Sequence, residues 1–312
     1  MLTVVAAMLA AVVGTGLANG ASSTKLPGKG VKFGISLPGL SSPGSVGIVE
    51  GLKCYANRVG GSVQGVDPGQ DINKQISQVT DMINGGVKAV MISPFSPSVI
   101  KALTPKAKAK GAYIIELGNP KSPASGSVSG INAQIGKLAA THMKDNISGE
   151  VRAVMIGGPP IPFAQALENG FTNAASQLGI KVLEVAHATQ FNTTTGRTIA
   201  ADLLTKHPDA NAIFVIEPSL GIGAGLAAKA RGSKIEVDAQ GATPQTISAI
   251  KSGTMTAIVD TQLAKYGFAG GKVGAKLVAK QKVSPVKIPN LIVDKSNVAK
   301  WKSPKAQCSS LR

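Results

Sequence analysis

The chain has 312 residues, of which 43% are apolar, 16% charged and 4% aromatic, and its formal net charge is +17. The high apolar share excludes a disordered protein, and a length beyond that of one compact core predicts two lobes. Lysines are dispersed along the predicted helices rather than mixed with aromatic residues, which argues against nucleic-acid binding.

The N-terminus begins with an uncharged apolar run from Leu2 to Leu17, followed by small residues as far as Ala21. This run is shorter than the about 20 residues needed to span a bilayer, so it predicts a cleaved signal peptide over residues 1–21 and an exported protein. No Lys or Arg precedes the run, and a buried hydrophobic helix is the alternative.

The first part of the chain alternates short apolar strands with amphipathic helices. The predicted strands cover residues 31–36, 62–66, 87–92, 112–117 and 127–131. The predicted helices cover residues 46–56, 71–84, 97–110 and 133–145. Nearly continuous Val and Ile runs between helices predict parallel strands that are covered on both faces.

The same alternation continues to the end of the chain. The predicted strands cover residues 151–156, 181–185, 212–216, 235–239, 256–260 and 291–293. The predicted helices cover residues 165–178, 194–206, 219–230, 244–252 and 264–280. Two successive sets of strand–helix units predict an α/β fold with two doubly wound sheets, whose ligands bind beyond the carboxyl ends of the strands.

The sequence contains two cysteines, Cys54 and Cys308. In an exported protein such a pair is a plausible disulfide, which here would hold the C-terminal tail to the first helix. Two unpaired buried thiols are the alternative.

The residues of common catalytic centres do not occur in the required patterns. His142, His187 and His207 are the only histidines, and no pair of them has metal-ligand spacing. No Gly-x-Ser-x-Gly turn follows a strand, no Walker motif is present, and the glycines of Pro218–Gly223 lack the dinucleotide fingerprint. We therefore expect a binding protein without metal or cofactor rather than an enzyme.

Polar and aromatic side chains gather where the predicted strands end. The candidate ligand-binding residues are Ser36, Ser41, Ser42, Ser93, Phe95, Glu116, Asn119, Asn132, Phe163, Gln165, Glu217, Gln240 and Gln262. Hydroxyl, amide and carboxyl groups beside aromatic faces suit a small polyhydroxylated ligand, because each ligand hydroxyl both donates and accepts. For Ser41, Ser42, Asn132 and Ser219, capping of a helix N-terminus is an alternative with at least equal weight. Glu217, between an apolar strand and Pro218, is a candidate for either capping or ligand binding.

Five segments resemble the ribose/galactose type of periplasmic binding proteins, the solute receptors of sugar ABC transporters. These segments are Asp71–Val79, Gly85–Pro94, Glu168–Phe171, Leu203–Phe214 and Gly241–Pro244. The resemblance implies two Rossmann-like lobes joined by three crossovers, which close like a hinge on the ligand. It divides the chain into a first lobe (31–130 and 262–284), a second lobe (131–261 and 285–300) and a tail (301–312).

The sequence differs from this family at positions where the family's sugar receptors carry charged residues. The family's Asp-Arg pair after the fourth strand corresponds here to Gly118-Asn119, and its Arg in the second lobe corresponds to Gln165. The family's Asn-Asp pair corresponds to Glu217-Pro218, and its Asp before Gly-Thr-Pro corresponds to Gly241, beside Gln240. The substitutions predict a ligand other than a pentose, such as a polyol, a modified sugar or another neutral polar solute.

The resemblance and the leader together predict a periplasmic, monomeric solute receptor that delivers its ligand to an ABC permease in the inner membrane. One alternative is a ligand sensor of the same fold that docks on a membrane histidine kinase or chemoreceptor. Another is a secreted hydrolase or isomerase that uses Glu116 and Glu217 as an acid–base pair.

Overall fold

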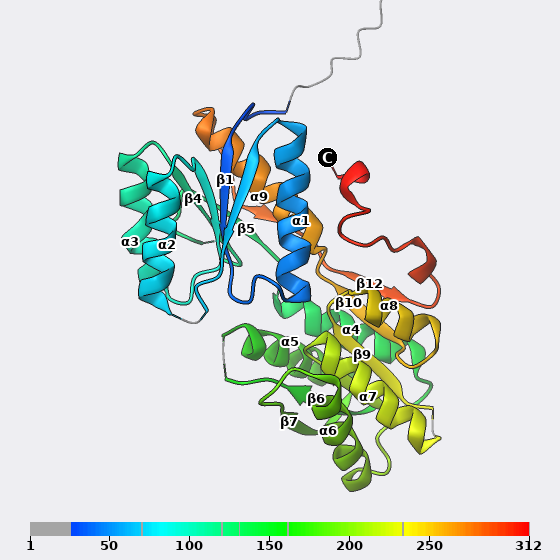
Figure 1. Ribbon diagram of the computed structural model, residues 1–312. Coiled ribbons are helices and arrows are strands. Elements are labelled where there is room, and N and C mark those ends of the chain that lie inside the picture. Colours follow the sequence, from blue (N-terminus) through cyan, green and yellow to red (C-terminus); the bar gives the residue numbers. More distant parts are fainter. Residues whose placement is uncertain are drawn as a thin grey trace, which may run out of the picture.

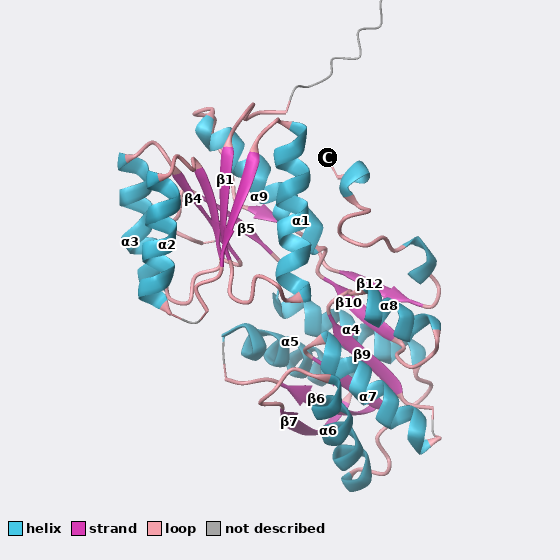
Figure 2. Ribbon diagram, viewed as in Figure 1, coloured by secondary structure: helices cyan, strands magenta, loops and turns pink. Residues whose placement is uncertain are grey.

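The structure is a computed structural model that describes residues 26–69, 71–119, 121–130, 132–160, 162–232 and 234–311. The predicted signal peptide, residues 1–21, lies outside the described residues. Within them, two six-stranded sheets flanked by helices form two lobes (Figures 1 and 2). The predicted α/β fold with two doubly wound lobes is confirmed. No helix in these residues has the length and apolar character needed to cross a membrane.

The first lobe is built on a sheet with the strand order β11-β5-β4-β3-β1-β2, in which all pairs are parallel. Its strands are β1 (Lys32–Ser36), β2 (Ser62–Val66), β3 (Ala89–Ile92), β4 (Tyr113–Leu117), β5 (Gly126–Ser129) and β11 (Val286–Lys287). Its helices are α1 (Pro43–Arg58), α2 (Ile72–Asn84), α3 (Pro97–Ala109) and α9 (Leu263–Val278). Apolar side chains of α1 and α9 cover one face of the sheet, and those of α2 and α3 cover the other.

The second lobe repeats this plan with the strand order β12-β10-β9-β8-β6-β7, in which only β12 is antiparallel. Its strands are β6 (Arg152–Gly157), β7 (Lys181–His187), β8 (Ala212–Val215), β9 (Glu236–Gln240), β10 (Ala257–Asp260) and β12 (Leu291–Asp294). Its helices are α4 (Asn132–Asn146), α5 (Pro162–Leu178), α6 (Thr193–Lys206), α7 (Pro218–Arg231) and α8 (Pro244–Lys251). Helices α6, α7 and α8 pack on one face of the sheet, and α4 and α5 pack on the other.

The chain passes between the two sheets after β5, after β10 and after β11. We predicted that residues 285–300 belong to the second lobe, and the structure corrects this for β11. Val286 and Lys287 pair in parallel with Val128 and Ser129 of the first sheet. A two-residue strand that follows Pro285 has no periodicity, so the sequence pattern does not reveal it.

Close packing of helices on glycine lets a chain with 4% aromatic residues fill its cores. A Cβ atom on Gly267 of α9 would lie 1.8 Å from the carbonyl oxygen of Ile48 in α1. A Cβ atom on Gly223 of α7 would lie 2.2 Å from the carbonyl oxygen of Thr193 in α6. Because interiors are close-packed, a methyl group at either position would force the helices apart.

The C-terminal segment is anchored to both lobes. Trp301, which follows the short helix η1 (Val298–Lys300), packs on the second-lobe core, and its Nε1 donates a hydrogen bond to Asp260 Oδ2 at 3.2 Å. Cys308, at the start of η2 (Cys308–Ser310), forms a disulfide with Cys54 of α1 across a Cα–Cα distance of 5.6 Å. Leu311 is buried in the first-lobe core. The predicted tail is therefore a link between the lobes.

Candidate functional site

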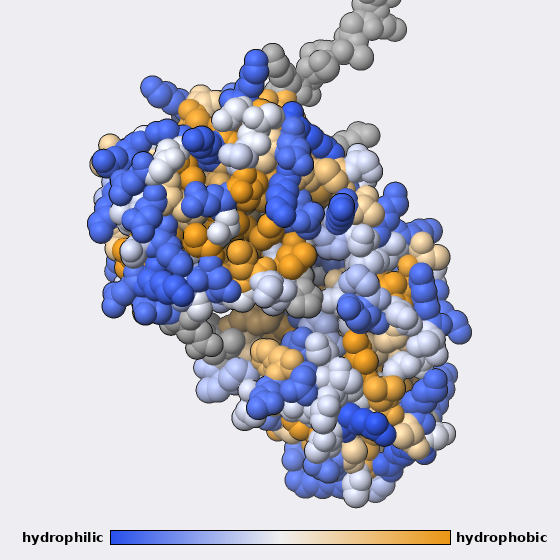
Figure 3. Space-filling model, viewed as in Figure 1, coloured by the Kyte–Doolittle hydropathy of each residue, from blue (hydrophilic) through white to orange (hydrophobic). Residues whose placement is uncertain are grey.

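A cavity of about 420 Å³ lies between the two lobes, where strands of both sheets end. The corresponding hollow is visible in the space-filling view (Figure 3). The first lobe contributes residues that follow β1, β3, β4 and β5, together with the starts of α1 and α9. The second lobe contributes residues that follow β7, β8 and β9, together with the starts of α4 and α5.

Six of the thirteen predicted ligand-binding residues line this cavity. Ser42 and Ser93 belong to the first lobe, and the others are Asn132, Phe163, Glu217 and Gln240. They meet because the carboxyl ends of the parallel strands face each other across the gap. Phe163 is 42% exposed, so its ring is available to a ligand.

Three of the predicted residues are turned into the protein, away from the cavity. Ser36 is fully buried, and Gln75 Nε2 donates a hydrogen bond to its hydroxyl oxygen at 3.3 Å. The Glu116 carboxylate is buried and accepts a hydrogen bond from the Ser122 hydroxyl. Gln262 is buried, and its side-chain amide donates to the carbonyl oxygen of Pro289. Since Glu116 does not line the cavity, it does not form an acid–base pair there with Glu217.

The other four predicted residues also lie outside the cavity lining. Ser41, Asn119 and Gln165 are exposed, and Asn119 Oδ1 accepts a hydrogen bond from the backbone N–H of Lys121 at 3.0 Å. Phe95 is half-buried beside α2, and its backbone N–H donates to a side-chain oxygen of that helix. A position directly after a strand was therefore not enough to predict that a residue lines the cavity, because the loops turn before these residues reach the gap between the lobes.

Two of the lining residues also cap helices, as the alternative interpretation proposed. Glu217 Oε2 accepts a hydrogen bond from the backbone N–H of Leu220 at 2.9 Å, which caps α7. Ser42 Oγ accepts from the backbone N–H of Ser45 at 3.4 Å, which caps α1. The helix N-termini therefore point at the cavity and hold these side chains in place.

Sequence reasoning missed several residues of the lining. Phe191 lies in the loop after β7, and its side chain is 47% exposed. An aromatic residue just past a predicted strand was the signal for it. Tyr266 comes from the first turn of α9, and Asn290 lies in the third crossover. Because β11 was not predicted, the third crossover was expected between residues 284 and 285, ahead of Asn290.

The cavity lining is almost free of charge. Among the described residues that line it, Glu217 is the single carboxylate, and there is no lysine, arginine or histidine. Leu37, Leu117 and Leu263 add apolar surface beside the two phenylalanines. Gly118 and Gly241, the positions where the resemblance implies acidic residues, have φ of 99° and 97°. Glycine adopts this backbone readily, whereas any other side chain would be strained there.

Asp67 holds the loop between β1 and α1 that forms one wall of the cavity. Its carboxylate accepts hydrogen bonds from the backbone N–H groups of Gly69 at 2.9 Å, Leu40 at 2.9 Å and Gly39 at 3.2 Å. The bonds from Gly69 and Leu40 are the main cause of the lowered pKa of Asp67. The loop conformation therefore depends on an ionised side chain.

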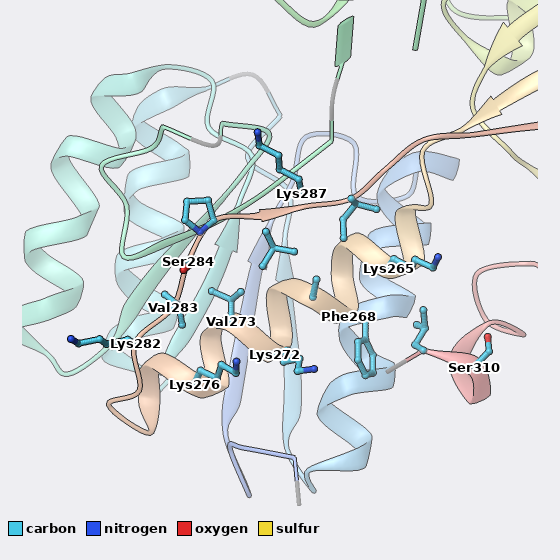
Figure 4. Close-up of a pocket in the computed structure, with 15 residues that line it drawn as sticks. Lys265, Phe268, Lys272, Val273, Lys276, Lys282, Val283, Ser284, Lys287 and Ser310 are labelled. Atoms are coloured by element: carbon cyan, nitrogen blue, oxygen red, sulfur yellow. The ribbon is translucent and has the colours of Figure 1, made fainter. Parts of the chain in front are cut away.

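A larger cavity of about 830 Å³ lies along α9 and the segment that leads into β11 (Figure 4). Five lysines line it, and no carboxylate does so among the described residues. They are Lys265, Lys272, Lys276, Lys282 and Lys287. None of the predicted ligand-binding residues reaches it, so it is separate from the interlobe cavity.

The second lobe contains a buried ionisable cluster at the end of β9 opposite Gln240. His142 Nδ1 of α4 lies 2.8 Å from Asp238 Oδ2 and 3.7 Å from Glu236 Oε1, and its Nε2 lies 3.6 Å from Asp294 Oδ2. Burial raises the pKa of Glu236 to about 7, with a further increase from Asp238. Burial also raises the pKa of Asp238, against the lowering effect of the His142 hydrogen bond.

The surroundings of His142 favour its charged form. Burial alone would lower the pKa of His142, but the hydrogen bond to Asp238 and the charges of three carboxylates outweigh it and raise the pKa. The sequence indicated no metal ligands because the histidines lack suitable spacing, and the three carboxylates come from strands far along the chain. The fold brings these four side chains together.

Two α/β lobes with a cavity at their facing strand ends define a two-lobed ligand-binding protein. The chain belongs to the periplasmic binding protein domain family, whose model matches residues 33–282. The predicted family resemblance is thus confirmed.

Known relatives support the same assignment. The ribose import binding protein RbsB of Bacillus subtilis (strain 168) is 29% identical over 237 residues, which cover 74% of this chain and 76% of the relative. The D-allose-binding periplasmic protein of Escherichia coli (strain K12) is 24% identical over 272 residues, which cover 82% and 87% of the two chains.

A solved structure shows the same fold. An ABC transporter periplasmic solute-binding protein from Actinobacillus succinogenes 130z, with bound D-allose, has a TM-score of 0.78 and 22% identity to this chain. The match covers 87% of this chain and 100% of that one.

Proposed function

We propose that this protein is the exported solute receptor of an ABC importer and binds a neutral sugar or polyol in the interlobe cavity, without converting it. The observation that carries the proposal is the composition of the cavity lining: hydroxyl and amide groups, two exposed phenylalanines and a single carboxylate. The family and the names of the relatives support a sugar-like ligand.

The absence of basic side chains from the described lining supports a neutral ligand. An anionic ligand, such as a sugar acid or sugar phosphate, would bury its charge beside Glu217 with no lysine, arginine or histidine among the described lining residues. An unpaired buried charge costs several kcal/mol, on the order of the whole binding free energy of a weak ligand. A neutral polyhydroxylated ligand has no such cost, and its apolar faces pack on Phe163 and Phe191.

Polar groups in the cavity supply the hydrogen bonds. Ser42 and Ser93 line the cavity, and the hydroxyl of each can donate to and accept from a ligand hydroxyl. Gln240 and Asn132 add amide groups from β9 and α4. A cavity of about 420 Å³ holds a ligand of monosaccharide size.

Location and partners complete the proposal. The apolar leader and the family support a periplasmic protein, and a monomer would present both lobe tips to an ABC permease in the inner membrane. Closure of the lobes on ligand would change the distance between these tips, which is the signal that a permease reads. Gel filtration at micromolar concentration tests the monomer, and cell fractionation tests the location.

A ligand screen tests the binding activity. Purified protein is screened by thermal shift and then by calorimetry against neutral pentoses, hexoses and polyols, with sugar acids and amino acids as contrasting classes. We expect micromolar binding within the neutral class and no binding of sugar acids. Failure of every neutral sugar and polyol to bind, or preferred binding of an anionic ligand, would contradict the proposal.

Variants then assign the binding to the cavity. We expect Phe191→Ala and Phe163→Ala each to weaken binding about tenfold, since stacking on an aromatic face is lost. Leu226→Ala is the matched control, because Leu226 is 38% exposed on α7 of the same lobe and does not line the cavity. Equal effects of the three substitutions would place the ligand elsewhere.

A further inference from the structure

The buried cluster around His142 contains three carboxyl groups but only one imidazole. His142 is 8% exposed, Glu236 is 6% exposed and Asp238 is fully buried. Among the described residues, Glu236, Asp238 and Asp294 all make their ion pairs with this one imidazole. Buried carboxylates are stable only when they are paired, protonated or bound to a cation.

The second observation is an unused acceptor atom that points into the cluster. Glu236 Oε1 lies 3.7 Å from His142 Nδ1 but makes no hydrogen bond to any described residue. Buried carboxylate oxygens without a donor are rare in folded proteins and require an explanation. A bound cation supplies one.

We propose that His142, Glu236 and Asp238 form a binding site for a divalent transition-metal ion of the zinc type. This site is independent of the proposed sugar receptor function, since it lies at the end of β9 opposite the cavity. One donor atom from each residue lies within 4.8 Å of the other two. Imidazole nitrogen with carboxylate oxygens is a common donor set for Zn²⁺, whereas Ca²⁺ and Mg²⁺ take oxygen ligands.

The distances are close to those of a coordinated ion. Donor atoms bound to one tetrahedral zinc at about 2.0–2.2 Å stand roughly 3.3 Å apart. The separations of 2.8 Å and 3.7 Å from His142 Nδ1 to the carboxylate oxygens of Asp238 and Glu236 bracket this value. Small side-chain rotations would therefore be enough, and the proton on Nδ1 would leave as the metal binds.

Asp294 completes the arrangement as a positioning residue. Its Oδ2 lies 3.6 Å from His142 Nε2, on the side of the ring away from the proposed metal. A carboxylate on the second ring nitrogen orients the imidazole and strengthens it as a ligand. The Asp294 side chain is 25% exposed, so the cluster reaches solvent at the edge of β12. In Figure 1, α4 lies beside β9 and β12 at this side of the second lobe.

The test uses untagged full-length protein, dialysed first against EDTA. Titration with ZnCl₂ in the calorimeter is expected to show one equivalent of bound zinc. At a hundredfold excess over the dissociation constant, the melting temperature should rise by at least about 5 °C. CaCl₂ should produce neither effect. Absence of stoichiometric zinc binding would overturn the proposal.

Near-isosteric variants locate the ion. Glu236→Gln and Asp238→Asn should each weaken zinc binding at least tenfold. The matched controls are His187→Gln and His207→Gln, which remove histidines that each pair with a single carboxylate in the same lobe. Zinc binding that survives both carboxylate substitutions, or that is lost in a control, would place the ion elsewhere.

A measurement on the unmodified protein guards against variants that fail to fold. The sequence has three histidines, so ¹⁵N-labelled imidazole signals can be assigned one by one. Zinc should shift the ring-nitrogen signals of His142 and leave those of His187 and His207 in place. Shifts confined to His187 and His207 would overturn the proposal.

Discussion

The two lobes have the same doubly wound plan but are stabilised differently. Both lobes have apolar cores on both faces of the sheet, and in the first lobe a disulfide joins the first helix to the C-terminal segment. The second lobe has no disulfide among its described residues and instead places a histidine and two carboxylates in its interior. Similar backbones thus tolerate very different interior chemistry, and the difference can be measured lobe by lobe.

The largest effect is expected from His142→Ala in the second lobe. Removal of the imidazole leaves Glu236 and Asp238 buried side by side, and loss of one partner of a buried ion pair typically costs about 3–5 kcal/mol. Trp301 is the only tryptophan and packs on this lobe, so its fluorescence during urea unfolding reports the change. His187→Ala, which removes a histidine whose side chain is 55% exposed, is the control and should change the unfolding free energy far less. Equal losses would show that burial of the cluster is unimportant.

The disulfide gives the next largest effect, and it concerns the first lobe. The double variant Cys54→Ser and Cys308→Ser should lose about 2–4 kcal/mol of unfolding free energy, because the bond closes a loop across a separation of 254 residues. Calorimetry with and without reductant measures the loss. Reductant should have no further effect on the double variant, whereas an unchanged melting temperature would contradict the stabilising role of the bond.

The smallest effect is expected from a substitution at Asp67, whose carboxylate holds the first-lobe wall of the cavity. Asp67→Asn should weaken ligand binding about two- to fivefold at neutral pH, since an uncharged amide is a poorer acceptor for three backbone N–H groups. The pKa of Asp67 is lowered in the folded protein, so the stabilisation is complete above the ordinary value of about 3.9 and is lost only as pH falls through the lower folded value. Calorimetric affinities from neutral pH to about pH 4 check this; a fall in affinity already at pH 5 would contradict it.

Periodicity and glycine positions were enough to predict the fold. The strand–helix alternation placed nearly every element, because buried parallel strands form apolar runs that end at helix caps such as Asp71 and Glu217. The short strand β11 was missed because pairing with β5, rather than local pattern, defines it.

The site was predicted less completely than the fold, for a physical reason. Six predicted residues line the cavity, but a sequence does not specify which way a loop turns after its strand. Ser36 and Glu116 follow the pattern of site residues yet are held inside by Gln75 and Ser122. Likewise, the contact of His142 with Asp238 joins residues 96 positions apart and depends on the packing of α4 against β9.

The C-terminal segment adds a fourth connection across the hinge, beyond the three crossovers. Trp301 is docked on one lobe and Cys308 is covalently bound to the other, and positions 301 and 308 are seven residues apart. Seven residues extend to at most about 25 Å. While the tryptophan stays docked and the disulfide is intact, this contour length sets an upper limit on how far the lobes can swing apart, and reduction of the bond removes that limit.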